Sequence, residues 1–313
     1  MNQEIISHMI QFWRKPTADK LRALRYRFKT GLWNHFCPQI PLPTRLPHGG
    51  WWLARNDLLS DAIFARICDA PDVKFLERFL REATTVIDIG AHLGFYTLLM
   101  SSRVGTQGHV LAFEPSPREF RHLRTHIRIN GRANVRLENA ALADRRGSME
   151  LFLTGPPGTT GNSLRRPQVN CVQSVAVPVV TLDEYLSKTD VREVDLIKLD
   201  AEGAELKILS GAVGLLSRSR RPLILCEIND PVIAAYGWEH RGEDVIEFLE
   251  TKGFRWHGLN ADGSPIVLVK SSSYSTDLIA VPEERVKELA VTAGEVRIIA
   301  ARSSKSAPAF TPT

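Results

Sequence analysis

The stretch VIDIGAHLG, residues 86–94, constrains the fold more than any other part of this chain. A run typical of a buried strand, with Asp88 near its end, leads directly into Gly90 and Gly94. A strand, a tight glycine turn and a helix form a cradle for a nucleotide, because glycine lets the backbone approach a ligand and a helix N-terminus attracts negative groups. The stretch therefore predicts a nucleotide-type ligand at the start of a helix over 94–103.

The spacing of the turn narrows the choice of ligand. A dinucleotide site requires G-x-G-x-x-G, which this turn lacks, so a NAD-dependent oxidoreductase is disfavoured. Asp88 would also repel a pyrophosphate and suits a ligand that carries an ammonium group. The next strand, HVLAFEPSP, ends in Glu114, and an acidic residue at that distance typically binds two ribose hydroxyls. Together these residues predict S-adenosylmethionine as the cofactor.

Strand and helix patterns alternate beyond this turn, which indicates a mostly parallel sheet covered by helices on both faces. Strands are expected at 86–89, 109–113, 135–139, 195–199, 222–228, 253–259 and 277–281. Helices are expected at 72–83, 94–103, 117–129, 203–217, 241–252 and 283–292. Residues 147–185 interrupt the alternation with two further strands and a short helix, TLDEYL, capped by Thr181. Within this interruption GTTGNSL, with Asn162 and Ser163, is either a lid over the site or a surface hairpin.

Several motifs in this order resemble the FkbM-type methyltransferases, which are class I S-adenosylmethionine-dependent enzymes. The resemblance covers roughly residues 75–230, and its most specific part is IKLDAEGAE in the fourth strand of the sheet. The matching stretches are VIDIGAHLGFYT (86–97), HVLAFEPSPREFRHLRTHIRIN (109–130), NVRLENAALADRRGSMELF (134–152), VVTLDEYL (179–186) and VDLIKLDAEGAELKILSGA (194–212).

The resemblance implies a Rossmann-like α/β fold with a seven-stranded sheet whose last strand is antiparallel. It also implies methyl transfer to a hydroxyl group of a sugar, lipid or secondary-metabolite acceptor. Cofactor binding is then assigned to Asp88, Gly90, His92, Gly94, Phe95, Tyr96, Thr97, Glu114, Asn139, Ala140 and Asp200. His92 stands where the family usually has Asn, and Ala201 where it usually has Val. His92 is either a cofactor contact or a turn residue, and Asn139 either pairs with the adenine or forms a turn.

The first candidate catalytic groups lie in and directly after the expected strand at 195–199. A hydroxyl acceptor must lose a proton, so a base is expected, with Glu202 and Asp200 first and His92 next as candidates. Lys198 and Asp200 share one face of their strand, and Glu227 on the neighbouring strand is the expected partner of Lys198. No metal site is expected, since no Asp-Asn pair joins Asp200.

The chain divides into a basic N-terminal helical extension with a Pro-rich linker (1–70), the methyltransferase domain (71–295) and a disordered tail (296–313). Residues 1–30 hold seven Lys and Arg against two acidic residues, so they carry the whole formal charge of +5. This segment is either an arm for an anionic membrane surface or nucleic acid, or a packed helix with Phe12, Trp13, Leu21, Leu24 and Phe28 facing inward.

The first 30 residues and four arginines of the 117–129 helix also raise RNA methylation as the alternative function, although no RNA-binding module is recognisable. A binding protein that has lost catalysis is a further option. The four cysteines are far apart, and the N-terminus does not resemble a signal peptide. A cytoplasmic location is therefore expected, with peripheral contact at the inner face of the membrane as an option.

Overall fold

A computed structural model describes residues 28–289, apart from residues 30, 34, 38–39, 56–58, 61–62, 64–69, 156–160 and 168–170. The expected disordered tail and most of the basic N-terminal segment therefore lie outside the described residues. Among the described residues, no helix is both long and apolar enough to cross a bilayer.

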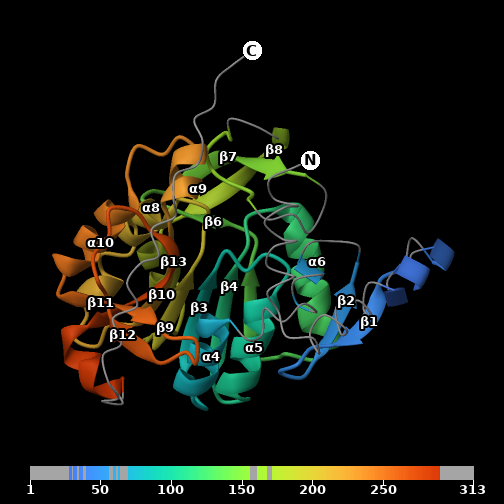
Figure 1. The fold of residues 1–313 in the computed structure, drawn as a ribbon, viewed down its shortest axis with the longest axis horizontal. Helices are drawn as coiled ribbons and strands as arrows, with labels where there is room; N and C mark the ends of the chain where they lie inside the picture. Colours follow the sequence, from blue (N-terminus) through green and yellow to red (C-terminus); the bar gives the residue numbers. More distant parts are fainter. Residues whose placement is uncertain are drawn as a thin grey trace.

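The centre of the molecule is an eight-stranded sheet in the order β12-β11-β13-β10-β9-β3-β4-β5 (Figure 1). Strands β5, β4, β3, β9 and β10 run parallel, whereas β13 is antiparallel to both β10 and β11. The strand bounds are β3 Thr85–Ile89, β4 His109–Phe113, β5 Val135–Glu138, β9 Leu196–Leu199, β10 Leu223–Asn229, β11 Phe254–Leu259, β12 Pro265–Val267 and β13 Ser275–Pro282. All seven expected strands are present with the last antiparallel, and β12 adds an eighth at the edge.

Helices cover both faces of this sheet, as the alternating pattern predicts. One buried cluster joins the sheet to α4, α5 and α6, and a second joins its other face to α7, α8 and α10. The helix bounds are α4 Pro71–Phe79, α5 Phe95–Val104, α6 Pro117–Ile129, α7 Leu182–Ser187, α8 Glu205–Ser210, α9 Asp230–Ala235 and α10 Gly242–Glu250. Thr181 caps α7 as expected, because its Oγ1 accepts a hydrogen bond from the Glu184 N–H.

The interruption at 147–185 forms a separate three-stranded sheet against one end of the central sheet. Its strands are β6 Ala141–Leu142, β7 Gly147–Thr154 and β8 Cys171–Val180, in the order β6-β8-β7. β7 and β8 form a long antiparallel pair, and an isolated bridge from Phe152 to Ser163 brings the chain after β7 back alongside it. This small sheet packs on the same core cluster as α8 and β9.

Two expected helices differ from the structure. The chain at 203–217 is divided into α8 and a short 3₁₀ turn, Leu215–Ser217. Gly211, which follows α8, lies so close to the neighbouring backbone that an added Cβ would be 2.0 Å from the Ala143 carbonyl oxygen. In place of the helix expected at 283–292, the described residues form a 3₁₀ helix, Glu283–Glu288, and residues 290–292 lie outside the described part of the chain.

Part of the N-terminal extension folds against α6. The Pro-rich segment expected to be a linker contains a hairpin of β1 Leu42–Arg45 and β2 Trp51–Ala54. Trp52 is fully buried and stacks on the His126 ring with the centroids 4.0 Å apart. The Leu53 N–H donates to His126 Nε2 at 3.2 Å, and the Trp51 N–H donates to the Asn130 side chain at 2.6 Å.

Candidate active site

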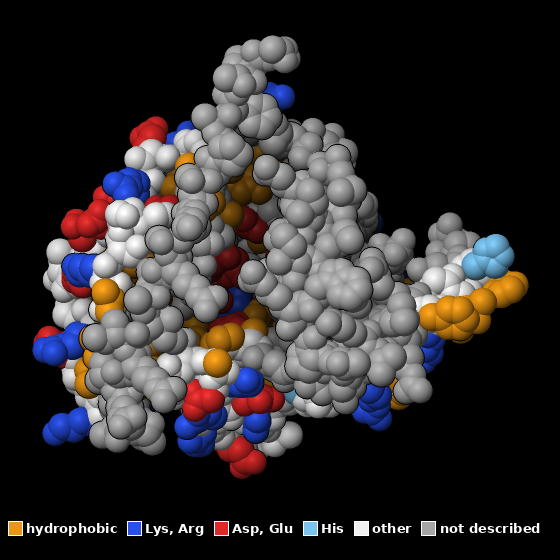
Figure 2. Space-filling view, viewed as in Figure 1, with side chains coloured by type: hydrophobic (Ala, Val, Ile, Leu, Met, Phe, Trp, Pro, Cys, Tyr) orange, Lys and Arg blue, Asp and Glu red, His pale blue; other side chains and the backbone are white. Residues whose placement is uncertain are grey.

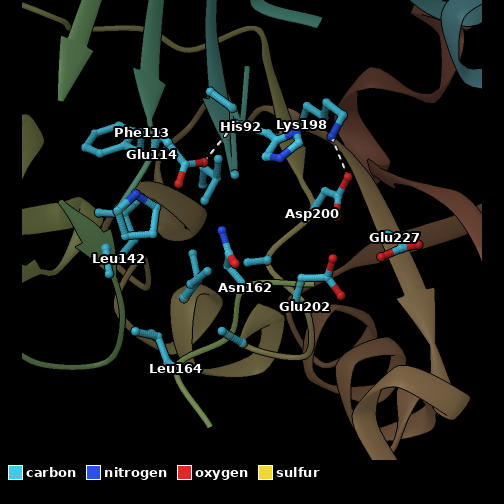
Figure 3. A pocket seen from close by; sticks show the side chains of 18 of the residues that line it. His92, Phe113, Glu114, Leu142, Asn162, Leu164, Lys198, Asp200, Glu202 and Glu227 are labelled. Atoms are coloured by element: carbon cyan, nitrogen blue, oxygen red, sulfur yellow. Dashed lines mark hydrogen bonds and ion pairs between the residues drawn. The ribbon is translucent and has the colours of Figure 1, made fainter. Parts of the chain in front are cut away.

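A cavity of about 300 Å³ opens beyond the carboxyl ends of β3, β4 and β9, where an open α/β sheet is expected to bind its ligand. Figure 3 shows the polar groups that converge on it, among them His92, Glu114, Asp200 and Glu202. The central sheet supplies the polar wall. The small sheet and the chain that follows β7 supply an apolar wall with Leu142, Leu151 and Leu164.

The turn after β3 has no room for a side chain at Gly90. Gly90 has φ +81°, and an added Cβ would lie 1.8 Å from the Asp200 carbonyl oxygen. The N–H groups of Gly90 and Ala91 both donate to the Phe113 carbonyl oxygen at 3.0 Å. The backbone of this turn is thus fixed against β4 and β9, and it forms part of the cavity wall as the glycine pattern predicts.

Glu114 joins the ends of β3 and β4. Its Oε2 accepts from the His92 N–H at 2.7 Å, and its Oε1 accepts from the Ser116 N–H at 2.8 Å. Burial raises the pKa of Glu114 to about 8, although both N–H groups favour its charged form. Each oxygen keeps a second lone pair, so this carboxylate can still accept hydrogen bonds from two hydroxyl groups of a ligand.

Asp88 lies fully buried just before the turn. Its Oδ2 accepts from Thr97 Oγ1 at 2.6 Å, whereas its Oδ1 is buried with no hydrogen-bond partner among the described residues. Burial raises the pKa of Asp88, and the nearby Lys198 opposes that rise. A buried carboxylate oxygen without a partner is expensive unless a donor reaches it when the site is loaded.

The partner of Lys198 is Asp200 and not Glu227, so that expectation is wrong. Lys198 Nζ lies 2.9 Å from Asp200 Oδ2 and sits over the Tyr96 ring at 4.4 Å from its centroid. Burial alone would lower the pKa of Lys198, but the charges of Asp200 and Asp88 outweigh it and the pKa is raised. Tyr96 in turn donates its hydroxyl to Asp72 of α4. Asp200 is therefore held by a buried cation.

Glu202 projects into the cavity from a strained position. Its φ of +53° is unusual for a residue with a side chain, and its carbonyl oxygen accepts from Ser163 Oγ at 3.2 Å and Trp238 Nε1 at 3.1 Å. Burial raises the pKa of Glu202 to about 8, with Asp200 and Glu205 adding to the rise. Glu205 points away into the loop, where it accepts from the N–H groups of Ala201 and Gly203 at 2.9 and 3.3 Å.

Two acidic residues of the cavity wall were not assigned to the site from sequence. Glu227 and Asp277 are paired residues on the antiparallel strands β10 and β13, and both line the cavity. Burial raises the pKa of each carboxyl, and the charge of Asp200 adds to both. An acidic residue in the otherwise apolar run LIAV was the available signal for Asp277, but nothing in the sequence gives the register that places it beside Glu227.

The structure brings most of the residues assigned to cofactor and catalysis to one cavity. Those that line it are Gly90, His92, Phe95, Tyr96, Glu114, Ala140, Asp200 and Glu202. Asp88, Gly94 and Thr97 lie behind the wall: Thr97 holds Asp88, and Gly94, with φ +95°, starts α5. Asn139 also lies behind it, and its amide donates to the carbonyl oxygens of Glu114 and Pro115 at 2.8 and 3.0 Å. This geometry favours the turn-forming role of Asn139.

Both ends of the cavity suit S-adenosylmethionine. Gly90 and Ala91 line the cavity with the backbone of the turn, and Glu114 offers two acceptor oxygens to a ribose. The surplus of carboxylates around Asp200 matches a ligand with ammonium and sulfonium charges. Within the described ranges, no group of three or more His, Cys, Asp or Glu side chains is arranged to hold a metal ion.

Known proteins with similar sequences or structures are methyltransferases. The 2-O-methyltransferase NoeI of Sinorhizobium fredii is 24% identical over 127 residues, which cover 36% of this chain and 51% of that protein. The hexuronic acid methyltransferase AglP of Haloferax volcanii is 25% identical over 144 residues, 46% of this chain and 56% of that protein. The crystal structure of an FkbM methyltransferase from Methylobacillus flagellatus has 15% identity and a TM-score of 0.40, covering 72% of this chain and 55% of that one.

The chain spans about half the length of the curated relatives that it matches. The family model described as "Methyltransferase FkbM domain" matches residues 88–256, which include the glycine turn, Glu114 and the IKLDAEGAE motif. Because this match spans more than half of the chain, the protein belongs to the FkbM family of S-adenosylmethionine-dependent methyltransferases.

Proposed function

We propose that this methyltransferase acts on oxygen, at a hydroxyl group of a sugar, lipid or secondary-metabolite acceptor. One observation carries the proposal: the Glu202 carboxyl lines the cavity with its pKa raised by burial to about 8. A hydroxyl group must lose its proton during methylation, and a base with a pKa near the working pH is the effective one. Glu202 meets this requirement better than Asp200, whose carboxylate is held by Lys198.

The reaction needs little more from the protein than position and a proton acceptor. S-adenosylmethionine supplies a methyl group that is already reactive. Gly90 and Glu114 would hold the cofactor, Glu202 would accept the proton of the acceptor hydroxyl, and the apolar wall at Leu142 and Leu151 keeps water out. The relative named as a 2-O-methyltransferase supports oxygen as the methylated atom, and the relative named as a hexuronic acid methyltransferase supports a saccharide as the acceptor.

The test has a binding step and a turnover step. S-adenosylhomocysteine should bind the purified protein in calorimetry, and Glu114→Gln should weaken it at least about tenfold because the amide nitrogen cannot accept a hydrogen bond from a ribose hydroxyl. Labelled S-adenosylmethionine is then offered with neutral, acidic and amino sugars and with lipid extracts. The methylated atom of the product is assigned by NMR.

Glu202→Gln tests the base directly. It should leave S-adenosylhomocysteine binding unchanged and lower kcat by about 10²–10⁴, and the wild-type rate should rise with pH up to about 8 as Glu202 loses its proton. Glu150→Gln, an exposed change on β7, is the matched control. Full activity of Glu202→Gln would remove this residue as the base, and a product methylated on nitrogen would refute O-methylation.

A further inference from the structure

Four large apolar side chains near the N-terminal end of the described chain face solvent. Phe28 is 73% exposed, Leu32 52%, Phe36 72% and Ile40 56%. The described residues from 28 to 36 are helical, and Phe28, Leu32 and Phe36 have the spacing of four that places side chains on one face of a helix. Phe28 therefore does not face inward as the packed-helix alternative expected, and the other residues of that alternative, Phe12, Trp13, Leu21 and Leu24, lie outside the described residues. We call these four residues the apolar stripe.

The apolar stripe stands apart from the core of the molecule. In Figure 1 the short helices at its position project away from the body beyond β1 and β2, and Figure 2 shows hydrophobic side chains at the tip of this projection. None of the four side chains belongs to either buried cluster. The neighbouring Trp33 packs against the cluster that joins the sheet to α4, α5 and α6. Trp33 also fixes the end of the segment, since its Nε1 donates to the Ile40 carbonyl oxygen at 2.6 Å. Contiguous apolar side chains left on a surface mark a binding site.

The chain around the stripe is strongly basic. From Lys20 to Asn56 the sequence has seven Lys and Arg residues and no Asp or Glu. Among these, Lys29 and Arg45 are exposed, and Arg45 lies over the Trp51 ring at 4.3 Å. The hairpin packs on α6, which exposes Arg121, Arg124 and Arg128. The surface that adjoins the stripe therefore favours an anionic partner.

We propose that the apolar stripe and the basic residues around it dock the protein on an anionic lipid surface. An amphipathic helix with Phe and Leu on one side and Lys and Arg beside it inserts its apolar face at the headgroup boundary while the cations meet anionic lipids. Two kinds of interaction thus act together, and neither alone gives stable attachment. Trp33 and Trp51, beside the stripe, are of the type enriched at this boundary.

Lipid fits these residues better than the two other candidate partners. RNA would match the positive charge and the rings of Phe28 and Phe36, but Leu32 and Ile40 offer no ring on which a base can stack. A second copy of the chain would bring a second set of basic residues to the same place, because a two-fold interface repeats its own charges. A lipid surface is the partner that matches both the aliphatic side chains and the charge.

The docking segment leads directly to the active site. The hairpin strand β2 ends at Ala54, and Leu59, five residues later, lines the cavity beside the glycine turn. Ser60 follows, fully buried, and its Oγ accepts from Trp52 Nε1 at 3.1 Å. The segment that carries the stripe is thus continuous in sequence with a residue of the cavity wall.

Vesicle flotation with the full chain tests the proposal. We expect the protein to float with vesicles of phosphatidylglycerol and phosphatidylcholine in equal parts, and to stay unbound with phosphatidylcholine alone. The double variant Phe28→Ser with Phe36→Ser should lower the partition coefficient at least about tenfold, because two large apolar contacts are lost. Arg121→Gln, Arg124→Gln and Arg128→Gln together should lower it too, and added salt should do the same to the wild type.

The control replaces two apolar residues of equal exposure elsewhere. Val267→Ser with Val269→Ser, exposed by 74% and 69% near the edge strand β12, should leave flotation unchanged. Circular dichroism checks that each variant is folded, and calorimetry with S-adenosylhomocysteine checks that its site is intact. Failure to float with the anionic vesicles, or an equal loss in both double variants, would overturn the proposal. So would RNA binding that persists in the Phe variant without any vesicle binding, or a dimer in sedimentation equilibrium that the Phe variant abolishes.

Discussion

At the scale of single residues, the turn between β3 and α5 requires a residue without a Cβ atom at position 90. Gly90 and Gly131 both have positive φ, +81° and +59°, but an added Cβ would meet the Asp200 carbonyl oxygen at 1.8 Å in one case and open space in the other. The two positions therefore separate backbone strain from a steric clash.

Gly90→Ala should lower the free energy of unfolding by more than about 3 kcal/mol, because a fixed backbone oxygen lies where the methyl group must go. Gly131→Ala should lower it by about 1 kcal/mol, the effect of the positive φ alone. Chemical denaturation of both variants measures the difference. Equal losses would mean that the turn shifts to accept the methyl group, and the close approach to β9 would then be unimportant.

Residues with a strained backbone conformation are concentrated at the cavity. Three described residues other than glycine have positive φ, and two of them, His92 and Glu202, line the cavity. Hydrogen bonds hold both: the His92 N–H donates to Glu114, and the Glu202 carbonyl oxygen accepts from Ser163 and Trp238. Strained residues persist only where their surroundings fix them, and here the fixed residues face the ligand.

At the scale of elements, one hydrogen bond connects α9 to the chain that closes the cavity. The Tyr236 hydroxyl, at the end of α9, donates to the Gly161 carbonyl oxygen at 2.5 Å. Gly161 and Asn162 line the cavity, and the Asn162 side chain accepts from the Thr154 N–H at 3.1 Å. Residues 161–164 are thus held from α9 and from β7, which favours the lid over the surface hairpin.

Tyr236→Phe should raise the KM for the acceptor several-fold, because it loosens the cavity wall at Gly161. It should also lower the free energy of unfolding by about 1 kcal/mol. Tyr274→Phe is the control, since its hydroxyl also makes a single backbone hydrogen bond, to the Ser271 N–H at 3.0 Å, away from the cavity. A rise in KM of equal size in both variants would show that general destabilisation, and not the contact to Gly161, is responsible.

Helices and strands could be predicted from the sequence where a local pattern, such as an apolar run, a glycine turn or a capping residue, determines where they begin or end. Apolar runs and glycine turns placed all seven strands of the methyltransferase sheet to within two residues, and Thr181 placed the start of α7. The close approach at Gly211 after α8 was not predictable, because it is made to Ala143, which is distant in sequence. The same holds for Asp277, whose place beside Glu227 depends on the register of β13, and for Leu59, which joins the site only because the hairpin packs on α6.

At the scale of the whole molecule, burying carboxyl groups around one cavity makes stability depend on pH. Burial raises the pKa of Glu114 and of Glu202 to about 8, whereas an exposed Glu titrates near 4.5. Between these values the folded protein holds protons that the unfolded chain has released, so its stability falls as pH rises. Two buried histidines act in the opposite sense at lower pH: burial lowers the pKa of His48 and of His126 to about 4, so both are neutral above 6.5 in either state.

Above pH 6.5, therefore, only the carboxyl effect remains, and we expect the cofactor-free protein to lose stability from pH 6.5 to 8. Each of the two glutamates should contribute a slope of about 1.4 kcal/mol per pH unit. Denaturant titrations at half-unit steps measure this slope. Glu202→Gln should remove only the share of the slope that Glu202 contributes, because an amide does not titrate, whereas Glu227, with its pKa raised to about 9, keeps its own share. Glu150→Gln on the exposed side of β7 should leave the slope unchanged. A slope that is flat or rising in the wild type would mean that these carboxyls are ionised in the folded protein. Glu202 would then be too weak a base for the role proposed for it, which connects the stability of the molecule to the chemistry of its site.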